Sequence, residues 1–131
     1  IIAHVGSHAE NLRHVANMLD HYPNMLVDTA ERISELGRQP YSARDFLINH
    51  QDRILYGTDL IPTESNISAN YRFFETRDEY FPYNSLDEHN QGRWNIYGVF
   101  LPDEVLKKIY YRNALRYIPR LARLVGEWKE N

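Results

Sequence analysis

The chain has 131 residues, a length that suits one domain. It is 43% hydrophobic and 25% charged, as folded globular proteins are, and its net charge of −3 gives no general reason to expect a nucleic acid or an anionic membrane as partner. The absence of cysteine excludes a disulfide framework and a cysteine-based zinc site, and it fits a reducing compartment such as the cytoplasm. No apolar run approaches the roughly 18 residues of a membrane span.

Three short apolar runs in the first half of the chain predict β-strands at residues 1–5, 25–28 and 53–56. A helical segment separates each strand from the next, which is typical of βαβ units with a buried parallel sheet. The predicted fold class is therefore α/β. Because the chain opens on an apolar strand, with no Met or polar residue before it, we expect residues 1–131 to be a single partial domain of a longer polypeptide.

Capping residues and Gly or Pro punctuation predict where the first helices begin and end. Ser7 and Glu10 have the spacing of a capping box, so a helix is expected to start there. Residues 30–36 are expected to form one or two helical turns. Ser42 can cap a further helix that ends before the third strand.

The strand and helix alternation stops in an aromatic-rich segment at residues 60–101. Within it, a helix is predicted at about 67–77 and an extended piece at 93–102. The segment is expected either to form a substrate wall or only to cover the core. Pro102 is predicted to start the last helix, and one face of that helix is basic. We expect this basic face to be solvated: Lys107, Lys108, Arg112, Arg116, Arg120 and Arg123.

Polar residues follow the predicted strands, at the end of a parallel sheet where active sites lie. His4 closes the first strand and Asp59 follows the third, about 10 Å away at about 4.8 Å per neighbouring strand. An imidazole and a carboxylate that converge are expected around a divalent metal with its water, or as an acid–base pair. Asp28, after the second strand, could shape the pocket floor or pair with Arg32, and the ion pair is favoured.

Three stretches, in chain order, carry a resemblance to a known family: IIAHVGSHAENL, YPNMLVDTA and DRILYGTDLIP. They resemble the sixth, seventh and eighth strands of metal-dependent hydrolases of the TIM-barrel amidohydrolase superfamily. In particular, they resemble the amidohydrolase-related branch (amidohydrolase 2), which includes aminocarboxymuconate-semialdehyde and resorcylate decarboxylases. The stretch KIYYRNALRY resembles that family's closing helix. The fold implied is the C-terminal portion of a TIM (β/α)8 barrel, about strands 6–8 with their helices.

The resemblance also implies roles for the two converging residues. Asp59 would ligate a divalent metal, zinc or manganese, and would accept the proton of the metal-bound water. His4 would polarise the substrate or act as general base. The family's other ligands, a His-x-His pair on the first strand and ligands on the fourth and fifth, have no counterpart here, so most ligands are expected outside this segment. The remaining histidines match no ligand position: His8, His14, His21, His50 and His89.

The function implied is that of a fragment of a hydrolase or a non-oxidative decarboxylase acting on a small carboxylate or carbonyl substrate. The expected partners are this substrate and the remainder of the barrel, with a homo-oligomer left open and neither nucleic acid nor membrane expected. Alone, the fragment is expected to be inactive and to associate through its uncovered strand edges. The alternative is a non-catalytic α/β binding or assembly module in which His4 and Asp59 are structural. A weaker alternative is nucleic-acid binding through the basic helix.

Overall fold

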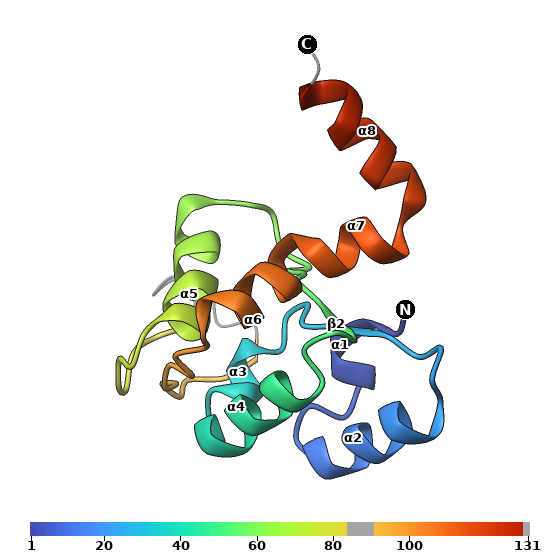
Figure 1. The fold of residues 1–131 in the computed structure, drawn as a ribbon. Helices are drawn as coiled ribbons and strands as arrows, with labels where there is room; N and C mark the ends of the chain where they lie inside the picture. Colours follow the sequence, from blue (N-terminus) through green and yellow to red (C-terminus); the bar gives the residue numbers. More distant parts are fainter. Residues whose placement is uncertain (84–90, 130–131) are drawn as a thin grey trace.

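The computed structural model describes residues 1–83 and 91–129. A small parallel sheet lies at the centre of this fold (Figure 1). β1 (Val27–Asp28) pairs in parallel with β2 (Ile54–Leu55). On the opposite edge of β1, Ile2 forms a parallel bridge with Val27. The order Ile2–β1–β2 agrees with the predicted βαβ alternation, although each paired segment is shorter than its predicted strand.

The first predicted strand, residues 1–5, is wrong beyond Ile2. The chain enters α1 (Ala3–Gly6), a turn in which His4 and Val5 have the left-handed φ values of 60° and 53°. Such a conformation costs a non-glycine residue about 1–2 kcal/mol. The Val5 side chain is only 1% exposed, so burial in the core offsets part of that cost.

The predicted capping box at Ser7 is also wrong, because Ser7 continues the left-handed turn with φ 57°. Helix α2 (Leu12–His21) begins later, after Asn11, whose side chain accepts a hydrogen bond from the His14 N–H. Asn is among the best N-cap residues because its short side chain reaches these backbone donors. The apolar face of α2 packs into the core through Leu12, Val15 and Leu19.

Two helices separate β1 from β2. α3 (Ile33–Leu36) is the short helix predicted at 30–36. α4 (Pro40–Asn49) begins before Ser42, so the predicted Ser42 cap is wrong. The fixed φ of Pro40 suits the first helical position, and this proline starts the helix with no side-chain cap.

The aromatic-rich segment contributes largely to the core. Helix α5 (Glu64–Glu75) starts at a Thr63 cap, a little earlier than predicted, and it buries Phe73 and Phe74. The piece predicted as extended at 93–102 runs beside this helix. Within this piece, Ile96 forms an antiparallel bridge with Phe81, which follows the helix. Backbone N–H groups of the same piece donate to the carbonyls of Phe73 and Phe74. In the segment as a whole, four aromatic side chains are buried in the core: Phe73, Phe74, Phe81 and Tyr83.

The last helical region consists of α6 (Asp103–Lys107), the π-helical turn η1 (Lys108–Arg112), α7 (Asn113–Tyr117) and α8 (Pro119–Lys129). Pro102 is the residue that precedes its first turn. Two basic residues pair with Glu104 and one with Asp52, and the remainder of the predicted basic face is exposed. α8 extends away from the rest of the fold (Figure 1).

The π-helical turn covers one edge of the sheet. The Ile109 carbonyl accepts a hydrogen bond of 2.9 Å from the Tyr56 N–H. The buried Asn113 side chain donates to the carbonyls of Ile54 and Gln51, at 2.7 Å each. The expectation that both outer strand edges lack partners is therefore wrong for β2. Within the described residues, no helix is long and apolar enough to cross a membrane.

Candidate functional site

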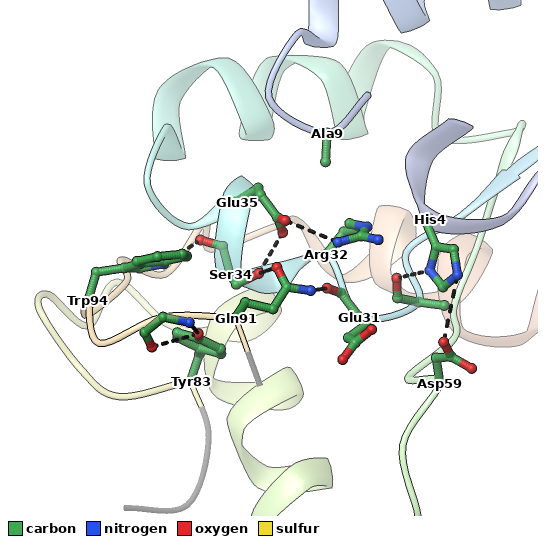
Figure 2. Close-up of polar contacts among 12 residues, drawn as sticks. His4, Ala9, Glu31, Arg32, Ser34, Glu35, Asp59, Tyr83, Gln91 and Trp94 are labelled. Atoms are coloured by element: carbon green, nitrogen blue, oxygen red, sulfur yellow. Dashed lines mark hydrogen bonds and ion pairs between the residues drawn. The ribbon is translucent and has the colours of Figure 1, made fainter. Parts of the chain in front are cut away.

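His4 and Asp59 lie together at the carboxyl end of the sheet (Figure 2). His4 Nε2 is 3.6 Å from Asp59 Oδ2, and their side chains are 28% and 56% exposed. His4 follows the bridge at Ile2, and Asp59 follows β2 after a short loop. The structure thus brings the two predicted site residues together, whereas their chemical roles stay predictions.

A backbone carbonyl fixes the orientation of the His4 ring. His4 Nδ1 is 2.8 Å from the carbonyl oxygen of Ala30, which can only accept a hydrogen bond. Nδ1 must therefore carry a hydrogen, and in the neutral ring the Nε2 lone pair faces Asp59. Ligand histidines at metal sites commonly donate their second ring N–H to a carbonyl in this way. The Nε2 to Oδ2 separation exceeds a hydrogen bond, so the two acceptors are far enough apart for a cation to lie beside both of them.

Asp28 positions the backbone that carries His4. Its Oδ1 accepts hydrogen bonds from the His4 N–H at 2.9 Å and from the Ala30 N–H at 3.0 Å. The predicted ion pair with Arg32 is wrong, because Arg32 instead binds Glu35 at 3.1 Å. Fixed backbone donors beside Asp28 satisfy its carboxylate without the entropy cost of ordering a long arginine side chain.

Backbone strain accompanies this geometry. His4, Glu31 and Asp59 have φ values of 60°, 54° and 55°. Non-glycine residues seldom adopt positive φ, and such residues cluster at functional sites when the surrounding structure holds them there. The Glu31 N–H donates to the Thr58 carbonyl at 3.1 Å, which links the loops after β1 and β2. The amino-acid pattern carries no signal for this strain, and the structure alone reveals it.

A small cavity of about 20 Å³ adjoins the loop that carries Asp59. Part of the aromatic-rich segment forms its wall: Gln91 Nε2 donates to the Glu31 carbonyl at 3.1 Å, and Gln91 Oε1 accepts from the Ser34 hydroxyl at 2.9 Å (Figure 2). A cavity of this size has room for about one water molecule, so the substrate-wall interpretation of the segment stays a prediction. The lining residues are Glu31, Ile33, Ser34, Thr58, Leu60, Asn70, Tyr83 and Gln91.

None of the other histidines that the structure describes forms an ion pair with Asp59. His8 is 3.6 Å from Glu10 and His50 is 3.9 Å from Asp20, and burial lowers the pKa of His50. His89 lies outside the described residues. Within residues 1–83 and 91–129, no group of three His, Cys, Asp or Glu side chains is placed to hold a metal ion. The remaining two, His14 and His21, are exposed.

The comparisons with known proteins give one match. A sequence model of the amidohydrolase family matches residues 1–120, a span that contains both His4 and Asp59. Neither a curated protein nor a solved structure matches the chain. Since the family match covers most of the 131 residues, it supports the resemblance carried by the strand-end motifs. The chain belongs to the amidohydrolase family.

Proposed function

We propose that residues 1–131 form the C-terminal part of a TIM barrel, about strands 6–8, in a divalent-metal-dependent hydrolase or non-oxidative decarboxylase. Three observations support this proposal: the amidohydrolase family match, the parallel order Ile2–β1–β2, and a polar site at the carboxyl strand ends. The substrate is a small carboxylate or carbonyl compound. The remainder of the barrel is the partner that the proposal requires.

The observation that carries the proposal is the approach of His4 to Asp59. Their donor atoms, an imidazole nitrogen and a carboxylate oxygen 3.6 Å apart, are of the types that zinc and manganese accept. These residues fit part of such a site, and the missing ligands come from outside the chain. A bound ion would supply Lewis acidity. Asp59 would hold it through a carboxylate oxygen, and His4 Nε2 would accept or return a proton at the substrate.

Closure of the barrel would require a change of hydrogen-bond partner at the outer edge of β2. That edge would pair with the first strand of the barrel, yet the Tyr56 N–H donates to Ile109 and the Ile54 carbonyl accepts from Asn113. A carbonyl oxygen can accept a second hydrogen bond, whereas an N–H donates to one good partner. We therefore expect the Tyr56 N–H to donate to a carbonyl of the first strand, and no longer to the Ile109 carbonyl, in the full-length protein.

Zinc titration of the full-length protein tests the proposal, with the apoprotein and its variants prepared in parallel. Loss of a ligand in Asp59→Asn is expected to weaken zinc binding by roughly 100-fold or more. His4→Gln, which removes the proton carrier, is expected to retain zinc far better than Asp59→Asn. The exposed His14 provides the matched control, and His14→Gln should bind zinc as the unchanged protein does.

The same experiment addresses the alternative, a non-catalytic module in which His4 and Asp59 only stabilise the fold. In that case the full-length protein binds no zinc or manganese at stoichiometric level. Asp59→Asn then changes only the free energy of unfolding. That pair of results would overturn the proposal.

A further inference from the structure

A second and larger cavity, of about 330 Å³, lies between the first turn of α4 and the chain that follows α5. Neither His4 nor Asp59 lines it, and it shares no lining residue with the small cavity beside them. Its volume is at the lower end of the range for small-molecule sites, about 300–1,000 Å³. The lining residues are Pro40, Tyr41, Arg44, Arg77, Asp78, Glu79, Tyr97, Gly98, Val99 and Phe100.

The floor of this cavity is held firmly in place. The Gly98 N–H donates to the Asp78 carbonyl at 2.8 Å. A Cβ atom at Gly98 would lie 2.2 Å from the Thr76 carbonyl oxygen, so the two chain segments approach as closely as glycine permits. The Arg44 guanidinium donates to the carbonyls of Val99 and Phe100. The cavity is therefore largely formed before any ligand enters, which reduces the ordering cost of binding.

Phe100 gives an independent sign of a functional surface. Its φ is 45°, a strained conformation for a residue with a bulky side chain, and the residue is 42% exposed instead of buried. The Arg77 guanidinium carbon lies 4.2 Å from the centre of that ring. Strain that the surroundings maintain is found preferentially at sites of function. Here it holds an aromatic ring and a guanidinium group at the cavity.

The cavity lining carries two arginines and two carboxylates, and Arg72, outside the lining, adds a third positive charge beside it. Arg72 binds Asp78 at 2.6 Å and neutralises it. Arg44 and Arg77 then face a single further carboxylate, that of Glu79. Within the described residues Arg77 forms no ion pair, and its stacking on Phe100 leaves its N–H donors available. An ammonium or guanidinium ligand would meet like charges, whereas a single carboxylate would balance the site.

We propose that this cavity binds a small monoanion that carries a flat apolar group. The anionic group accepts hydrogen bonds from Arg77, and the flat group packs against Tyr41, Tyr97 and Phe100. Planar rings stack favourably on aromatic side chains and on arginine. The site is separate from the metal chemistry proposed for His4 and Asp59, so it does not depend on that proposal.

Calorimetric titration of the full-length protein with benzoate tests the inference. Benzyl alcohol supplies the ring without the charge, and acetate supplies the charge without the ring. Both are expected to bind at least about tenfold more weakly than benzoate. Arg77→Gln and Tyr41→Ala should each weaken benzoate binding, the first by roughly tenfold. Tyr41 is 86% exposed, so its truncation leaves the fold intact.

Two control variants separate this cavity from other sites. In titrations of the metal-free protein, Asp59→Asn should leave benzoate binding unchanged, because Asp59 does not line the cavity. Arg120→Gln removes an exposed arginine elsewhere and should also have no effect. The inference is overturned if benzoate does not bind, if benzyl alcohol binds equally well, or if Arg77→Gln binds benzoate unchanged. Loss of binding in Asp59→Asn would place benzoate at the His4–Asp59 site and overturn it too.

Discussion

Replacement of Asp28 tests how the chain positions His4. Asp28 Oδ1 accepts from the N–H groups of His4 and Ala30, at 2.9 and 3.0 Å. Asp28→Ala removes both bonds from a half-buried loop, and each is worth about 0.5–1.5 kcal/mol net. The left-handed turn at His4 and Val5 then loses its outer support. We expect a loss of roughly 1–3 kcal/mol in the free energy of unfolding.

Urea unfolding of the full-length protein at neutral pH measures this loss. Asp28→Asn retains the accepting Oδ1 without the charge, so it should recover most of the stability. Asp45 is an exposed aspartate of α4, and Asp45→Ala should change the free energy by less than about 0.5 kcal/mol. If Asp28→Ala and Asp45→Ala are equally mild, the carboxylate does not hold the turn and the reasoning is refuted.

Three further predictions concern stability. Burial lowers the pKa of His50 below 6.5, against the opposing effect of Asp20, so the unfolded state takes up the proton first. The contribution of His50 to the free energy of unfolding is then full above pH 6.5 and falls as the pH drops below that value. Urea unfolding at pH values on either side of 6.5 should show a smaller fall in this free energy for His50→Gln than for the unchanged protein. The Tyr56 hydroxyl is buried without a partner in the described part of the chain, so Tyr56→Phe should retain stability or gain up to about 1 kcal/mol. Burial also raises the Tyr56 pKa to about 12, so the phenolate signal of this residue should be absent from an absorbance titration at lower pH. Gly98→Ala places a Cβ against the Thr76 carbonyl and should cost roughly 1–3 kcal/mol in thermal or urea unfolding, whereas an unchanged midpoint would contradict the close approach.

The paired segments of the sheet were predictable because apolar runs between helical segments have few other interpretations. Val27–Asp28 and Ile54–Leu55 fall within the predicted strands at 25–28 and 53–56. The proximity of His4 and Asp59 was predictable for a related reason, since parallel strands bring their carboxyl ends to one edge.

Features that depend on distant partners were not predictable. The apolar residues before Gly6 suggest a strand, and the contacts that accompany the left-handed turn instead, Val5 in the core and the Asp28 carboxylate on the His4 N–H, come from distant parts of the fold. Once Ser7 belongs to that turn, it can no longer cap a helix, although its spacing to Glu10 is that of a capping box. The π-helical turn depends on β2, because it presents the Ile109 carbonyl to Tyr56.

Cavities assembled from separate segments leave no local pattern either. The larger cavity joins α4, the chain after α5, and residues 97–100, which are far apart in sequence. Nothing in the sequence around Arg44 or Arg77 marks either arginine as part of a binding site. Their shared surface follows only from the packing of these segments.

Anomalous diffraction at the zinc edge, on crystals of the full-length protein grown with zinc, tests the central claim most directly. We expect an anomalous peak about 2.0–2.2 Å from an Asp59 carboxylate oxygen, with histidine ligands from other strands and His4 Nε2 facing the ion's open side. A structure in which Asp59 contacts only His4, with no peak at the carboxyl ends of the strands, would contradict it.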